Sequence, residues 1–175
     1  DANGLTYTGL LNLVGADTIQ LSVNDNGASG EGGAKSAMDS ISVAVSGSLK
    51  DVWRNAHFSV ALLTDPTKEA THWGDSVDPD GDQQDNHHEF VVDTDPNSMA
   101  SKFDFRILPG DNGRDLIFSP IRPGRSYSVE YFDQLGGSAM SLSGGAASDQ
   151  GEVRTVSDSA NAPRRFYRVV ISVAE

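Results

Sequence analysis

Side-chain oxygens recur at alternate positions in a twelve-residue segment near the middle of the chain, residues 78–89. Aspartate occupies positions 1, 3 and 5 of this segment, asparagine position 9 and glutamate position 12. In a tightly curled loop, side chains at this spacing converge on one point, and the backbone carbonyl at position 7 adds another oxygen. A shell of about six to eight oxygens suits Ca²⁺. The predicted ligands are Asp78, Asp80, Asp82, Gln84 through its carbonyl, Asn86 and Glu89.

Three other interpretations of this acidic segment stay open. It can be a solvated loop without an ion, although neighbouring aspartates repel one another when no cation lies between them. Magnesium is a weaker candidate because it keeps its waters and uses fewer carboxylates. Zinc bound by His72, His87 and His88 is another, but adjacent histidines point in different directions. Position 6, usually glycine, is Gln83, so we expect either a looser site or a different turn.

The chain as a whole is acidic. Among its 175 residues, 13 are basic and 25 acidic, which gives a net charge of −12. This charge disfavours nucleic acid and anionic lipid as partners, because both require clustered lysine and arginine. Cysteine is absent, which excludes disulfides, thiolate metal sites and a cysteine nucleophile. No stretch approaches the roughly 18 apolar residues that would predict membrane insertion. The N-terminus has no signal-peptide pattern, which indicates a cytosolic chain or a mature or excised segment.

The sequence contains none of the common catalytic motifs that we sought. It has no Gly-x-Ser-x-Gly elbow, no His-Glu-x-x-His pair and no phosphate-binding glycine loop followed by Lys-Ser or Lys-Thr. Acid pairs could support glycosidase chemistry, but nothing in their spacing selects two of them. We therefore predict that the protein is not an enzyme.

Alternating apolar and polar residues predict a mainly β fold around the acidic loop. Segments 18–23 and 40–45 alternate as half-buried strands do, with a glycine-rich turn between them, and 5–13 supplies one more strand. Ser48 and Asp51 resemble a capping box. It would begin a helix ending before Asp65, whose apolar face comprises Leu49, Val52, Trp53, Ala56, Val60 and Leu63. Five further strands are expected, at 102–108, 115–119, 127–132, 152–157 and 165–173.

These patterns resemble a C-terminal module of large secreted bacterial surface proteins. The resemblance rests on residues 52–58, Asp65-Pro66, the acidic loop, Phe90, 94–96, 124–131 and 165–169. It implies a dockerin-like or thrombospondin type 3-like (EF-hand-like) calcium loop between two short helices, with Asp95 ending the second helix, and then a β-domain. The loop side chains at 78, 80, 82, 86 and 89 are the ligands that it implies. Residues 18–45 are similar to the last strands of a bacterial cadherin-like repeat, in which Asp17 and Asp25 match positions near calcium junctions.

The predicted architecture therefore has antiparallel β-sandwich elements flanking a short helix–calcium loop–helix. Its parts are a partial cadherin-like β segment over 1–46, the helix–loop–helix over 47–98 and a small antiparallel β-sandwich over 99–175. A full sandwich requires about 100 residues, so the first segment lacks strands. It can pair with the C-terminal β-domain, belong to a longer chain, or gain a strand from another subunit. Strand addition from a second subunit would propagate head to tail into a fibre or tube.

The expected function is that of an extracellular, cell-surface structural or adhesive protein stabilised by Ca²⁺. Its partners would be copies of itself in a filament, or other surface proteins. The alternative is a non-catalytic carbohydrate-binding accessory module of a secreted hydrolase. In that case Trp73, Tyr127, Tyr131 and Tyr167 would contact polysaccharide through exposed rings.

Overall fold

The fold was analysed in a computed structural model that describes residues 7–10, 12–27, 32–111, 113–142, 146–160 and 164–174. Strands account for 40% and helices for 18%, and the sheets are antiparallel, so the predicted mainly β fold is confirmed. The chain divides into two compact units, Asp1–Pro66 and Thr67–Glu175. Their boundary lies inside the predicted middle segment 47–98, and the three-part division stays a prediction.

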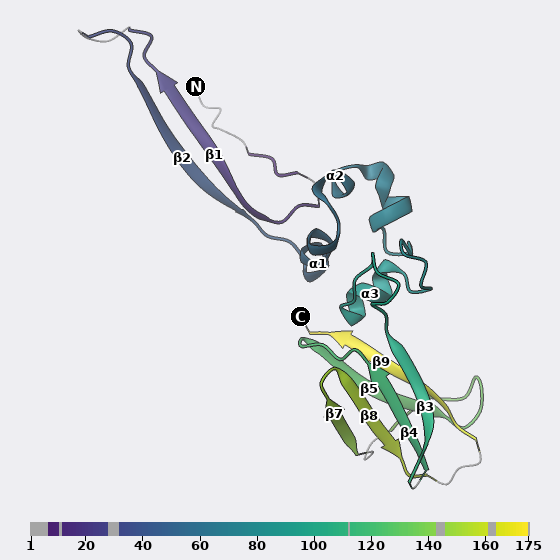
Figure 1. The fold of residues 1–175 in the computed structure, drawn as a ribbon. Helices are drawn as coiled ribbons and strands as arrows, with labels where there is room; N and C mark the ends of the chain where they lie inside the picture. The colour runs from purple at the N-terminus through teal and green to yellow at the C-terminus, as the bar shows by residue number, and fades with distance from the viewer. Residues whose placement is uncertain are drawn as a thin grey trace. The chain divides into compact units, whose positions relative to one another are not determined.

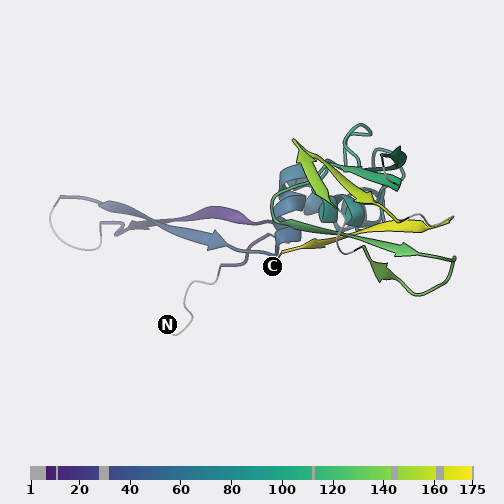
Figure 2. The same cartoon turned by 90° about the horizontal axis from the view of Figure 1, so that it is seen from below.

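A long two-stranded hairpin is the main feature of the first unit (Figures 1 and 2). Strands β1 (Gly15–Asn24) and β2 (Ser36–Val45) pair over ten residues each in one continuous antiparallel register. They contain the predicted strands 18–23 and 40–45. The prediction of a strand over 5–13 is wrong for residues 7–10 and 12–13, which form no strand. Residues 5, 6 and 11 lie outside the described part of the chain.

The two faces of this hairpin differ in polarity. Residues directly opposite each other in an antiparallel pair share a face, and Ile19 pairs with Ile41 while Val23 pairs with Ala37. Much of this apolar face is exposed within the described residues, since Val23 keeps 67% and Ile41 46% of its surface. This face, called the apolar face below, comprises Ile19, Leu21, Val23, Ala37, Ile41, Val43 and Val45, and it also carries Asp17 opposite Val43 and Asp39 opposite Leu21.

Two short helices follow the hairpin where the sequence predicts one. Helix α1 (Leu49–His57) begins with the expected capping box between Ser48 and Asp51. Phe58 and Ser59 are extended, and α2 (Val60–Leu63) is a single turn, so the prediction of one continuous helix is wrong. The break lets the ring of Phe58, 5% exposed, pack edge-on against Trp53 at 6.1 Å. Four residues of the predicted apolar face lie exposed: Leu49, Val52, Ala56 and Val60.

The second unit begins with irregular helical turns that lead into the acidic loop. A 3₁₀ turn (η1, Pro66–Lys68) starts at the unit boundary, and a π-helical turn (η2, Glu69–Trp73) follows it. Helix α3 (Asn86–Val92) comes directly after the loop. No helix in the described parts of the chain is long and apolar enough to cross a membrane.

Two antiparallel sheets complete this unit (Figure 1). One has the order β3 (Asp104–Gly110), β4 (Gly113–Ser119), β8 (Val153–Asp158), β7 (Ala147–Gln150); the other has β6 (Met140–Ser141), β5 (Arg125–Phe132), β9 (Phe166–Val173). The buried cluster of Leu116, Phe118, Val129 and Val156 draws on both sheets, which therefore share one core. All five predicted strands are present with ends shifted by one or two residues, whereas β6 and β7 were not predicted. We call β3 to β9 the two-sheet region.

Candidate metal centre

Three of the predicted ligands lie together in the loop. One carboxylate oxygen from each of Asp78, Asp80 and Asp82 lies within 4.8 Å of the others, and the described residues contain no other such group of potential metal ligands. Backbone amides hold the carboxylates in place. Gly81 N donates to Oδ1 of Asp78 at 2.7 Å, and Gln83 N donates to Oδ2 of the same residue at 2.9 Å. The loop is therefore curled around its own acids, as the twelve-residue spacing predicts.

The turn at position 6 forms despite the absence of glycine. Gln83 has φ of +78°, and Gly81 has the same value. A side chain in this left-handed region destabilises the fold by about 1 kcal/mol. Gln83 therefore adopts the left-handed conformation that glycine usually provides at this position, so the turn at Gln83 is not the different one expected, and a looser site stays a prediction. The strain is local to one exposed residue.

Glu89 carries the strongest indication of a ligand. It lies one turn into α3 with 0% of its surface exposed, and neither carboxylate oxygen has a hydrogen-bond partner among the described residues. Burial, followed by the charges of Asp80, Asp82, Asp78 and Asp95, raises the pKa of Glu89 to about 8. A buried carboxylate without a partner is strongly unfavourable, and a cation would remove that penalty.

Two of the aspartates also keep an oxygen for a ligand. Oδ2 of Asp80 and Oδ2 of Asp82 are buried and accept no hydrogen bond from any described residue. Burial raises the pKa of Asp80, and the nearby carboxylates of Asp82 and Asp78 add to that effect. Burial acts in the same direction on Asp78, but the amides of Gln83 and Gly81 outweigh it and lower the pKa of Asp78. The buried end of the cluster is thus the end that lacks compensating donors.

Asn86 and Gln84 use their side-chain amides elsewhere in the fold. Nδ2 of Asn86 donates to the carbonyls of His72 and Gly74, both at 2.8 Å, which joins α3 to η2. Its Oδ1 is buried and has no partner among the described residues, so it stays available as the predicted ligand. The side chain of Gln84 bonds to the backbone of Phe103, so the atom of Gln84 predicted as a ligand, its backbone carbonyl, is not needed for this contact.

Both ends of α3 are closed by aspartates. Asp85 caps the N-terminus by accepting the amide of His88 at 2.9 Å. Asp93 follows the last helical residue in the left-handed conformation, with φ of 69°. The helix therefore ends at Val92, and the expectation that Asp95 ends it is wrong. Asp95 instead accepts the amide of Asn97 in a turn.

The histidines do not form a zinc site in the described residues. Nδ1 of His72 lies 2.8 Å from the hydroxyl of Thr71, and Nδ1 of His88 lies 2.6 Å from Asp85. No group of metal-ligating side chains that contains a histidine occurs among them. Oxygen donors alone define the candidate centre, and this donor set fits a hard cation such as Ca²⁺.

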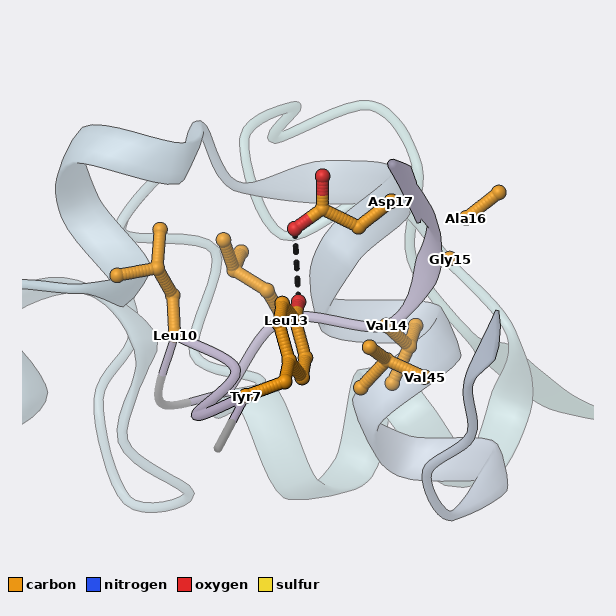
Figure 3. Close-up of a pocket in the computed structure, with 8 residues that line it drawn as sticks. All are labelled: Tyr7, Leu10, Leu13, Val14, Gly15, Ala16, Asp17 and Val45. Atoms are coloured by element: carbon orange, nitrogen blue, oxygen red, sulfur yellow. Dashed lines mark hydrogen bonds between the residues drawn. The ribbon is translucent and has the colours of Figure 1, made fainter. Parts of the chain in front are cut away.

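The acids matched to cadherin-like junctions have structural roles in the hairpin. Asp25 accepts the amides of Gly27 at 2.9 Å and Lys35 at 2.7 Å, near the turn. Asp17 accepts the hydroxyl of Tyr7 at 2.7 Å, in a cavity of about 150 Å³ at the hairpin base (Figure 3). The rest of that cavity is apolar, with Leu10, Leu13, Val14 and Val45 among its lining residues. Because Tyr7 and Asp17 bond to each other, this cavity does not present a second polar side chain to a ligand among the described residues that line it.

The aromatic residues considered for carbohydrate are engaged within the fold. Trp73 is only 4% exposed. The guanidinium of Arg165 covers the ring of Tyr131 at 3.9 Å, and the hydroxyl of Tyr167 donates to Asp158 at 2.6 Å. Tyr127 packs with its ring 5.8 Å from that of Phe118. Trp73 is therefore buried, Tyr127 packs against the core, and one ring face of Tyr131 is covered by a guanidinium.

Comparisons with protein-family models, with curated proteins and with solved structures found no match. The chemistry of the centre accordingly follows from its own residues: three converging aspartates, and a glutamate that is fully buried without a partner.

Proposed function

We propose that this chain is a calcium-stabilised structural module of an extracellular protein. The observation that carries the proposal is the environment of Glu89. Its two carboxylate oxygens are buried and have no hydrogen-bond partner among the described residues. The charges of Asp80, Asp82 and Asp78 act on it strongly enough to help raise its pKa. Such an arrangement is unfavourable as a set of anions and favourable as a shell of oxygen ligands.

Calcium fits this donor set better than magnesium does. Four carboxylates, a carbonyl and an amide oxygen supply the larger number of oxygens that Ca²⁺ takes, whereas Mg²⁺ retains most of its waters. A bound ion would join the loop to α3 through Glu89 and remove the repulsion among the acids. Since the unfolded chain has no such site, calcium at about 100 times its Kd would stabilise the fold by about 2.7 kcal/mol.

The test is a Glu89→Gln variant, with calcium binding followed by titration calorimetry and unfolding followed by circular dichroism. We expect wild-type protein to take up calcium and to melt at a higher temperature in its presence. The variant should lose this response. Without calcium and near pH 7 it should melt no lower than the wild type, because a pKa of about 8 keeps the buried carboxyl of Glu89 largely protonated, and glutamine replaces one neutral side chain by another.

Glu69→Gln is the matched control, since Glu69 is exposed and lies outside the cluster. It should retain the full response to calcium. Absence of calcium uptake by the wild-type protein would refute the proposed site. A Glu89→Gln variant that unfolds more easily without calcium would assign Glu89 a purely structural role.

Assembly with copies of itself is the second part of the proposal, and the hairpin carries it. Natural sheets commonly protect their edges with proline and charged residues, lysine above all. Neither β1 nor β2 contains lysine, arginine or proline, and each has a single charged residue, Asp17 in β1 and Asp39 in β2. A two-stranded hairpin with an exposed apolar face is marginally stable by itself. We take the occupant of its edges to be the hairpin of a second copy.

The pairing inside the hairpin supports a second copy as the occupant of these edges. In the register that β1 and β2 already use, Asp17 faces Val43 and Asp39 faces Leu21. Repeating that register between the β1 edge of one copy and the β2 edge of the next opposes no like charges and continues the apolar face. Both outer edges stay free in such a contact, so it propagates head to tail as a filament.

A further inference from the structure

Calcium binding has a direct structural route from the loop into the two-sheet region. Gln84 lies between two predicted ligands, and its own backbone amide donates to Oδ1 of Asp82 at 2.8 Å. Its side chain reaches the residue ahead of β3: Nε2 donates to the carbonyl of Phe103 at 2.8 Å, and the amide of Phe103 donates to Oε1 at 3.0 Å. One residue therefore contacts both a metal-site carboxylate and the backbone that leads into the first sheet.

Phe103 extends this connection into the core. Its ring lies 6.0 Å from that of Phe118, which is 1% exposed and belongs to the buried cluster shared by both sheets. Because protein interiors are closely packed, a shift of Phe103 changes contacts made by Phe118. The position of Gln84 is thus coupled to the packing of the four-stranded sheet.

Arg125 makes a second connection, from the three-stranded sheet to α3. At the start of β5, its Nε donates to the carbonyl of Val91 at 2.7 Å and its terminal nitrogen to that of Phe90 at 2.9 Å. The guanidinium also lies over the ring of Phe90, 5.6 Å from its centroid, and its side chain is only 10% exposed. These carbonyls are in the last turn of the helix that carries Glu89, where backbone acceptors lack intrahelical partners.

We propose that Gln84 and Arg125 are positioning residues that transmit calcium binding to the two sheets, a role that rests on the calcium site proposed above. When the ion is released, repulsion among the acids displaces the loop and α3. Gln84 then loosens β3 and the four-stranded sheet, and Arg125 loosens β5 and the three-stranded sheet. Calcium accordingly governs the opening of strands that contribute none of its ligands.

The experiment combines titration calorimetry with hydrogen exchange measured on peptides from each strand. At calcium about 100 times its Kd, strands that open only after the ion leaves should exchange about 100-fold more slowly than without calcium. Gln84→Ala should lose this slowing mainly in β3 and β4. Arg125→Lys, which keeps the charge but not the two-pronged contact, should lose it mainly in β5 and β9. Because Gln84 also offers its backbone carbonyl to the ion, calorimetry first gives the Kd of each variant, and exchange is compared at calcium about 100 times that variant's own Kd.

Two conservative controls are available nearby. Gln83→Ala changes an exposed neighbouring side chain, and Arg106→Lys changes an exposed arginine in β3. Both should keep the slowing. If the wild-type protein binds calcium while its strands exchange at the same rate with and without it, the coupling is refuted and the site stands. Full strand protection in both Gln84→Ala and Arg125→Lys would refute the role of these residues. No calcium uptake by the wild type would refute site and coupling together.

Discussion

At the scale of single residues, the geometry of the acidic loop depends on two residues with left-handed backbone conformation. Gly81 and Gln83 share a φ of +78°, yet only one of them is glycine. The left-handed region is open to glycine and costs other residues about 1 kcal/mol. The loop therefore carries strain at Gln83 and none at Gly81.

Exchanging the residue types at these two positions should change stability in opposite directions. We expect Gln83→Gly to raise the free energy of unfolding by about 0.5 to 1 kcal/mol with calcium bound, because relief of strain exceeds the entropy gained by the unfolded chain. Gly81→Ala should lower it by about 1 kcal/mol, although a Cβ there would meet no atom within 4 Å. Urea unfolding at saturating calcium measures both. A loss of stability in Gln83→Gly would contradict the strain.

The spacing of the acidic side chains can be recognised in the sequence, whereas the contacts that support them in the fold cannot. Alternate aspartates and a glutamate at position 12 are visible because oxygen ligands follow a fixed spacing. The contacts of Gln84 with Phe103 and of Arg125 with α3 join residues 19 to 35 positions apart. No local pattern encodes such contacts, since they depend on how the sheets fold back. The complete burial of Glu89 is likewise a property of the assembled unit.

At the scale of elements, Asp158 joins the two sheets. It ends β8 with 3% of its surface exposed. It accepts Arg165 at 2.8 Å, just ahead of β9, and the hydroxyl of Tyr167 within β9 at 2.6 Å. Burial would raise the pKa of Asp158, but the bonds from Tyr167, from the amide of Ala160 and from Arg165 outweigh it and lower that pKa. Folding therefore favours the charged form of this carboxylate.

This lowered pKa predicts a specific pH dependence of stability. A carboxylate whose pKa is lower in the folded state stabilises the fold fully above its unfolded pKa of about 3.9, and loses that effect as pH falls through the folded value. We expect Asp158→Asn to lower the free energy of unfolding by about 3 kcal/mol at pH 7. The difference from wild type should shrink below about pH 4. Urea unfolding across pH 3–7 measures it.

Asp104→Asn is the control for this measurement, because Asp104 forms an exposed ion pair with Arg106. Exposed pairs contribute less than about 1 kcal/mol, so its effect should be small at every pH. If the difference in the free energy of unfolding between wild type and Asp158→Asn stays constant down to pH 3, the lowered pKa of Asp158 is contradicted.

Periodicity predicted the elements unevenly. Strands β1, β2 and β5 could be predicted because apolar and polar residues alternate along much of each strand. The two-residue β6 and the fully exposed β7 have no apolar alternation to detect. The predicted helix to residue 63 failed for a different reason. The helical spacing of apolar residues continues on both sides of Phe58. Phe58 itself is extended, and its ring packs on Trp53, so the helix is interrupted there.

At the scale of the whole molecule, the two units differ in how completely each buries the apolar residues of its strands. The second unit buries a core between its two sheets. The first exposes Ile41, Val23 and Met38 on a sheet of only two strands, Met38 at 75%. A net charge of −12 opposes association between copies, and this repulsion is screened by salt. Assembly through the hairpin should therefore strengthen as ionic strength rises.

A lysine on the apolar face of the hairpin tests that assembly. Ile41→Lys places a charge where neighbouring hairpins would continue their apolar surface, a device by which natural sheets prevent edge pairing. Ser40→Lys is the matched control, because it adds the same charge to the adjacent residue of β2 on the opposite face. Light scattering at about physiological salt and in calcium should show polymers for wild type and Ser40→Lys, and monomers for Ile41→Lys. A wild-type protein that stays monomeric at every concentration contradicts assembly, and polymers of Ile41→Lys as abundant as those of wild type contradict the role of this face.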